Sequence, residues 1–313
     1  MSASFENVTG GIAAEHAKAF AAIGGTQPCW VVSRLEAEAV KFAKQWKFEQ
    51  AGVSLEEALC DPRVALVVIA SPSGLHAAQT LQALDAGKDV IVEIPVALNL
   101  AESEQVSQRA RQSGKRVFVC HTMRSFPAIR EVRRRVQAGE LHVTQVQGFF
   151  AIPRRRNQGF VGQRHWIDNL LWHHACHQVD AAIWTLGVER ADCVSAMPGR
   201  AHPKFGMAMD VSVQFRTASQ QLVTQSLTYN TEQFWWELRF VGDEDVLTFR
   251  NGQFLNEKNE SLLPELDWLD LRAQNSNMTA ALIESHASDY DIDSILATMR
   301  LLQRAQESGE GKL

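Results

Sequence analysis

The sequence has no apolar run long enough to cross a membrane and no C-x-x-C pair. Its five cysteines are scattered, which is typical of a reducing compartment rather than of a disulfide scaffold. Basic residues are not in excess either, because the net charge is -5, so we expect no nucleic acid among its main partners. The first eight residues lack a basic stretch followed by an apolar core, so we expect no secretory signal, no membrane partner and a cytoplasmic location.

The composition matches a soluble globular protein, because 45% of the residues are hydrophobic and 21% are charged. These proportions exclude a disordered or collagen-like chain. At roughly 150 residues per domain, a chain of 313 residues predicts two domains. We place them at residues 1–122 and 123–313, where the sequence pattern changes.

In the first domain, apolar runs alternate with helical patterns. The strand-like runs are Cys29–Ser33, Val64–Ala70, Asp89–Ile94 and Arg116–Cys120. Continuous apolar runs are typical of parallel strands that are covered on both faces. The helical patterns between them predict an α/β domain with a doubly wound Rossmann sheet.

After residue 122, short strand-like runs lie among helices. We expect strands at Val143–Ala151, Met207–Phe215, Gln221–Tyr229, Phe234–Val241 and Val246–Arg250, and helices at Pro127–Ala138, Asp168–Leu186 and Ile292–Gln306. Hairpin-like connections predict an open, mainly antiparallel sheet in an α+β domain. The C-terminal helix could pack back on the first domain.

A pair of glycines indicates the nucleotide site. Gly10, Gly11 and Ile12 stand where a G-x-G-x-x-G loop would open the first helix and bring its N-terminus to a pyrophosphate. Val8 replaces the first glycine of that loop, so a plain glycine turn before a helix is the alternative interpretation.

The two residues that follow the second predicted strand indicate whether NAD or NADP binds. Ser33 and Arg34 stand where an NAD-specific site carries a carboxylate for the ribose 2′-hydroxyl. A hydroxyl and a guanidinium suit a 2′-phosphate instead, so we expect NADP, with NAD as the alternative cofactor. A solvated turn is the structural alternative.

Two strand-end motifs, Ser71–His76 and Glu93–Pro95, resemble those of the Gfo/Idh/MocA oxidoreductase family. The resemblance implies an N-terminal Rossmann domain and a C-terminal domain that binds substrate and forms oligomers through an open antiparallel sheet, here as a dimer or tetramer. It places a set of residues at the nicotinamide half of the cofactor site: Ser71, Pro72, Ser73, His76, Glu93, Ile94 and Pro95. The family usually has Glu-Lys-Pro at the second motif, with the lysine in proton transfer, and Ile94 can do no such chemistry.

Three further segments, His121–Arg124, Arg154–Asn157 and Trp166–Asp180, resemble one branch of that family. Its members oxidise a carboxylated cyclic hemiacetal of aromatic catabolism with NADP. The resemblance therefore implies a small carboxylate substrate and oxidation at a CH–OH group.

Histidines on one predicted helix are the candidates to replace the lysine. His173 and His177 are four residues apart and share a face with Asp180. Taken alone, they suit general acid–base catalysis, a metal site or ordinary hydrogen-bonded structure. The missing lysine and the resemblance favour catalysis, so we expect His177 as the principal base, His173 as its partner or as a substrate ligand, and no metal.

A dicarboxylate substrate needs cations, because guanidinium groups bind carboxylates in fork geometry. We expect Arg124, Arg164, Trp166 and His174 to contact substrate. We expect Asp168 to cap the histidine helix. A sugar or cyclitol dehydrogenase, or a relative without catalytic activity and with an altered glycine loop, are the alternative functions.

Overall fold

The computed structural model of the chain describes residues 2–6, 11–155, 158–159, 162–163 and 168–309. The chain forms two compact units. The first unit comprises Met1–Cys120, Gly159–Gly162 and Leu269–Leu296, and the second comprises His121–Gln158, Gln163–Trp268 and Ala297–Leu313. Residues 269–296 thus return to the first unit, and the long helix α9 (Ile292–Ser308) contributes to both.

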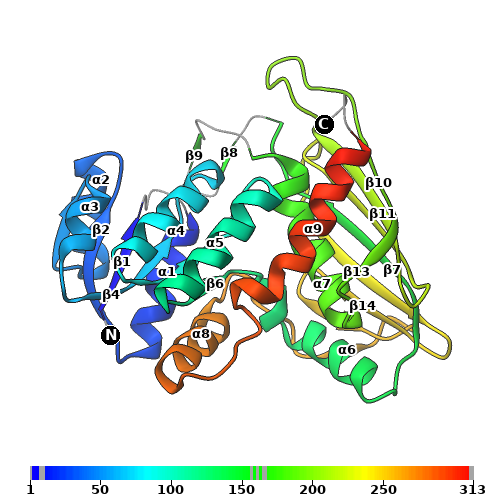
Figure 1. Ribbon diagram of the computed structural model, residues 1–313. Coiled ribbons are helices and arrows are strands. Elements are labelled where there is room, and N and C mark those ends of the chain that lie inside the picture. Colours follow the sequence, from blue (N-terminus) through cyan, green and yellow to red (C-terminus); the bar gives the residue numbers. More distant parts are fainter. Residues whose placement is uncertain (1, 7–10, 156–157, 160–161, 164–167, 310–313) are drawn as a thin grey trace. The chain divides into compact units, whose positions relative to one another are not determined.

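The first unit is built on a sheet of six parallel strands in the order β3-β2-β1-β4-β5-β6 (Figure 1). Its strands are β1 (Ser2–Glu6), β2 (Gln27–Val32), β3 (Gln50–Gly52), β4 (Val64–Ile69), β5 (Asp89–Val92) and β6 (Val117–Val119). Its helices are α1 (Gly11–Ile23), α2 (Glu36–Trp46), α3 (Leu55–Cys60), α4 (His76–Asp85), α5 (Leu100–Ser113) and α8 (Arg272–Glu284). The predicted doubly wound sheet is confirmed.

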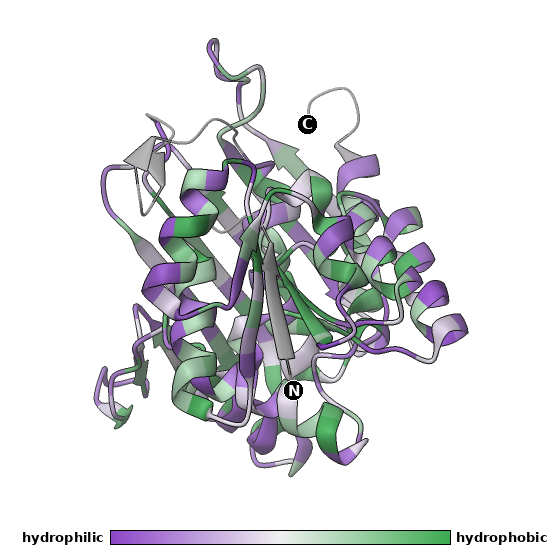
Figure 2. Ribbon diagram, turned by 90° about the vertical axis from the view of Figure 1, so that its left-hand side faces the viewer, coloured by the Kyte–Doolittle hydropathy of each residue, from purple (hydrophilic) through white to green (hydrophobic). Residues whose placement is uncertain are grey.

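The apolar run of β4 explains why helices cover both faces of this sheet. Leu66 and Val68 belong to a buried cluster with side chains of α1, α2 and α8. The alternating residues Val67 and Ile69 point to the opposite face, where α4 contacts β4 and β5. Figure 2 shows apolar colour on strands in the interior and a mixed colour on the helices. All strands therefore end at one edge, and the strand order reverses between β1 and β4, where nucleotides bind in such sheets.

The second unit is built on a sheet of eight strands in the order β10-β11-β12-β7-β13-β14-β15-β16. Its strands are β7 (Val143–Ala151), β10 (Ala191–Pro198), β11 (Asp210–Thr217), β12 (Leu222–Thr228), β13 (Trp235–Gly242), β14 (Val246–Arg250), β15 (Gln253–Leu255) and β16 (Ser261–Leu263), with β8 (Gln158–Gly159) and β9 (Gly162–Gln163) as a separate pair. Only β12 and β7 pair in parallel, so the predicted antiparallel character is confirmed. The sequence patterns do not predict β10, β15 and β16 as strands, because these segments are short or half-polar.

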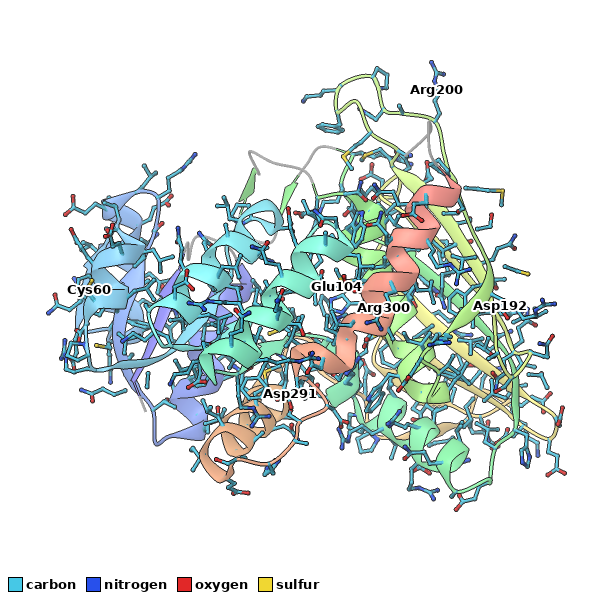
Figure 3. All side chains as sticks on the ribbon, in the orientation of Figure 1. Cys60, Glu104, Asp192, Arg200, Asp291 and Arg300 are labelled. Carbon is cyan, nitrogen blue, oxygen red and sulfur yellow. The ribbon has the colours of Figure 1, made fainter. Side chains whose placement is uncertain are left out.

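Helices cover one face of this sheet. Helix α7 (Cys176–Leu186) contacts β7 and β12, and α6 (Pro127–Gln137) contacts β14. The opposite face carries exposed apolar side chains, among them Phe149, Leu222 and Trp235. Across the described ranges, no helix combines the length and the apolar character that a membrane span requires. All five cysteines are free, and two of them, Cys193 and the Cys60 that ends α3, are exposed (Figure 3).

Candidate functional site

The ends of β4 and β5 are fixed to each other by His76. Its Nε2 lies 2.8 Å from the carbonyl oxygen of Ser71, and its Nδ1 lies 2.7 Å from that of Pro95. The ring is 1% exposed, so both strand-end loops are held by a buried contact. The Ser71 hydroxyl donates to Gln79 at 2.6 Å. Of the residues predicted for the nicotinamide half of the site, His76 thus holds the loops, and its direct contact with cofactor stays a prediction.

The residues after β2 take different positions. Ser33 is buried, and its hydroxyl donates to the Glu38 carboxylate at 3.4 Å. Arg34 is exposed, and within the described ranges it has no hydrogen-bond or ion-pair partner. Its guanidinium is thus available to an anion beside the end of β2. Glu38 had no signal in the sequence, because it is an ordinary acidic residue in the first turn of a helix.

Gly11 is the first residue of α1, which starts after β1 at the reversal of strand order. The position suits a pyrophosphate, because the free N–H groups of a helix N-terminus bind anions. Gly10 lies outside the described residues, as do Arg164 and Trp166.

The histidine segment opens with a π-helical turn, Leu171–Ala175, before α7 begins. Single π-turns of this kind are frequent at functional sites. The cap of this turn is Asn169, whose side-chain oxygen accepts from Leu171 N at 3.0 Å and Trp172 N at 3.2 Å. The expectation that Asp168 caps the helix is therefore wrong. The Asp168 carboxylate lies 3.8 Å from Nε2 of His173 instead.

The three histidines of this segment divide between two environments. His173 and His177 are both partly exposed, whereas His174 is buried. The His174 ring stacks on Phe150, with 4.7 Å between ring centroids, and its Nδ1 lies 2.8 Å from the Tyr229 hydroxyl. His174 is thus held against the sheet, and its contact with substrate stays a prediction.

A buried charge lies behind His177. Asp180 accepts from Nε and Nη2 of Arg124, at 2.7 and 2.5 Å, and from the Thr298 hydroxyl at 2.7 Å. Its Oδ2 is 3.4 Å from Nδ1 of His121, whose ring meets that of His177 edge-on at 6.2 Å between centroids. Burial raises the pKa of Asp180, but Arg124 and His121 outweigh burial and hold that pKa below its usual range.

This arrangement places the partly exposed His177 ring beside His121, which in turn lies next to the buried pair of Asp180 and Arg124. An imidazole in such a place is a candidate for proton transfer. Arg124 is 1% exposed, and its guanidinium donates to Asp180. A substrate contact of Arg124 stays a prediction. His121 belongs to one of the motifs named above, but no pattern in the sequence predicts its place beside Asp180.

The neighbouring arginines are also occupied. Arg154 is 8% exposed and donates to the carbonyl oxygen of Pro153, and the exposed Arg155 pairs with Glu232 at 3.2 Å. Both guanidinium groups therefore already have a partner within the protein.

The sequence matches two family profiles, described as "Oxidoreductase family, NAD-binding Rossmann fold" over residues 9–121 and "Bacterial oxidoreductases, C-terminal" over residues 127–263. The 4-carboxy-2-hydroxymuconate-6-semialdehyde dehydrogenase of Sphingobium sp. is 29% identical over 300 residues, which are 94% of each chain. The scyllo-inositol 2-dehydrogenase (NAD(+)) of Bacillus subtilis is 29% identical over 119 residues, 38% of this chain and 35% of that relative. The crystal structure of GenD2 from gentamicin A biosynthesis, in complex with NAD, has a TM-score of 0.86 at 20% identity and covers 99% of this chain and 94% of that chain.

Proposed function

We propose, from the premise that the chain belongs to the Gfo/Idh/MocA family of nicotinamide-dependent oxidoreductases, that it oxidises a carboxylated cyclic hemiacetal with NADP. The specific substrate we propose is the hemiacetal of 4-carboxy-2-hydroxymuconate-6-semialdehyde or a close analogue, and the product is the lactone 2-pyrone-4,6-dicarboxylate. One observation carries the proposal. The strand-end residue Ile94 cannot transfer a proton, whereas the partly exposed His177 ring meets the His121 ring, which lies beside the buried Asp180 carboxylate.

The proposed chemistry divides between the cofactor and the imidazoles. A nicotinamide bound at the first unit would supply the acceptor for the hydride of the hemiacetal carbon. His177 accepts the hydroxyl proton, which a neutral imidazole can do near neutral pH. The His121 ring meets His177 edge-on and lies beside Asp180, so this buried group would help to position the His177 ring. His173 is partly exposed, as His177 is. The Asp168 carboxylate lies 3.8 Å from Nε2 of His173 and would orient that ring.

Cationic and aromatic side chains would hold the substrate carboxylates. Arg124, Arg164, Trp166 and His174 remain our candidates, by residue type and by their place in the motifs. We also propose that the chain works as a homodimer or tetramer in the cytoplasm. The exposed apolar side chains on the open sheet face, such as Phe149 and Leu222, support a protein contact there.

Arg34→Ser tests the cofactor preference. Arg34 is the exposed cation after β2, so its loss should weaken binding of the 2′-phosphate. We expect KM for NADP to rise about 10- to 100-fold, since a hydrogen bond to a charged group contributes about 1.5–3 kcal/mol. KM for NAD should change little. An equal rise in both values would contradict the proposal.

The substrate is tested by following NADPH absorbance with a panel of ring-cleavage semialdehydes, sugars and cyclitols. We expect the highest kcat/KM with a dicarboxylated semialdehyde. A preference for a neutral polyol would reject the aromatic substrate and leave the family assignment intact.

Two observations support a neutral polyol as the substrate. The relative that acts on scyllo-inositol matches the chain over 119 residues, and Arg124 is engaged by Asp180 rather than free for a carboxylate. The third possibility is a relative that has lost catalytic activity. Titration of NADPH and NADH fluorescence distinguishes it from both dehydrogenases, because it would bind neither cofactor at millimolar concentration.

A further inference from the structure

Three side chains of the first unit converge at the edge where the strands end. They are His16 of α1, Glu93 directly after β5 and Cys120 directly after β6. Nε2 of His16 lies 2.7 Å from Oε1 of Glu93 and 3.9 Å from Sγ of Cys120. The possible ligand atoms of all three lie within 4.8 Å of one another. Among the residues that the structure describes, no other group of three or more His, Cys, Asp or Glu side chains is gathered in this way.

The cluster is buried, which distinguishes it from a chance group of surface residues. His16 and Cys120 are fully buried, and the side chain of Glu93 is 12% exposed. An imidazole nitrogen, a thiolate sulfur and a carboxylate oxygen form the mixed donor set that zinc accepts. Three protein ligands would leave one position of a tetrahedral ion open.

A fourth residue orients the imidazole. Nδ2 of Asn275, a buried residue of α8, lies 3.0 Å from Nδ1 of His16. In this orientation the amide nitrogen donates to Nδ1, whereas a histidine that binds a metal donates its second N–H to an acceptor, which fixes the ring and its tautomer. When Nε2 binds a metal, Nδ1 carries the proton, and the Asn275 amide can turn to present its oxygen to it.

The spacing is close to what an ion needs. Ligand atoms at about 2.0–2.3 Å from a tetrahedral zinc are about 3.3–3.7 Å apart. The His16–Cys120 distance of 3.9 Å nearly meets this spacing, and the carboxylate of Glu93 must retreat from its 2.7 Å hydrogen bond. Glu93 is the partly exposed member, so its side chain is the one with room to move.

We infer that His16, Glu93 and Cys120 bind one divalent zinc ion. The ion would tie α1 to the ends of β5 and β6, and so would fix the position of Glu93. This site goes beyond the proposed dehydrogenase reaction, although Glu93 also belongs to the residues that we propose for the nicotinamide half of the cofactor site. The histidines assigned to proton transfer belong to the second unit.

Cobalt titration of the full-length chain tests the inference, because a thiolate ligand gives Co²⁺ a charge-transfer band that other ligands do not. After dialysis against a chelator, we expect one equivalent of Co²⁺ to bind with this band, and Zn²⁺ to remove it. Cys120→Ser should abolish the band and weaken Zn²⁺ binding at least about 10-fold. Cys176→Ser is the matched control, since Cys176 is a buried thiol of the histidine helix, and it should keep the band.

Glu93→Gln provides a second variant that keeps the side-chain shape. It should weaken Zn²⁺ binding about 10- to 100-fold while the far-ultraviolet circular dichroism stays that of the parent. Failure of the parent to bind one equivalent, binding without a thiolate band, or a band that depends on Cys176 and not on Cys120 would each overturn the site. None of these readouts requires substrate or nicotinamide, so they are independent of the proposed function.

Discussion

His177→Ala should lower kcat about 100- to 10,000-fold, the usual contribution of a positioned acid–base group. The dissociation constant of NADPH should stay close to the parent value, because the candidate cofactor residues belong to the first unit and His177 belongs to the second. Steady-state turnover and a fluorescence titration of NADPH measure the two quantities on the same preparation.

His142→Ala is the matched control for this variant. His142 precedes β7 and is exposed, and its backbone oxygen, rather than its ring, accepts from Asp243. We expect its kcat to be unchanged. A His177→Ala enzyme with parental kcat would end the assignment of His177 as base.

Asp180→Asn should destabilise the protein by about 3–5 kcal/mol, because it leaves the Arg124 guanidinium buried without its counter-charge. The substitution keeps the side-chain shape, so little of the loss can come from packing. Urea unfolding followed by tryptophan fluorescence measures the change. Asp192→Asn is the control, since Asp192 is exposed on β10 (Figure 3) and should change stability by less than about 0.5 kcal/mol.

The same carboxylate predicts how stability depends on pH. The pKa of Asp180 in the folded chain lies below its ordinary value of 3.8, since Arg124 and His121 outweigh the effect of burial. Its contribution is therefore present above the unfolded pKa and is lost as the pH falls through the lower, folded value. The stability difference between the parent and Asp180→Asn should shrink as the pH is lowered below about 4. A difference that stays constant down to pH 2 would contradict this explanation.

The class of each unit could be predicted from the sequence because burial leaves a direct pattern. The run Val64–Ile69 is apolar at successive positions, as a strand covered on both faces must be. The alternating pattern of β11 and β12 likewise indicates a sheet that is open on one face. Short strands such as β15 and β16 carry too few residues for such a pattern.

Pairings between distant residues could not be predicted in this way. Arg124 and Asp180 are 56 residues apart, and His16 and Glu93 are 77 apart, so no local period connects them. The capping error has a different cause. Asp168 and Asn169 are adjacent and both suit a cap, and the π-helical turn that selects Asn169 leaves no signal in a period of 3.6 residues.

We propose that an imidazole takes the role that the family resemblance assigns to a lysine, and the pH dependence of kcat tests this most directly. For the parent, we predict that kcat falls as the pH is lowered through the ordinary imidazole range near ~6.5, because the base becomes protonated. In His177→Ala this acid limb should disappear from the residual activity. An acid limb that persists unchanged in the variant would contradict the account.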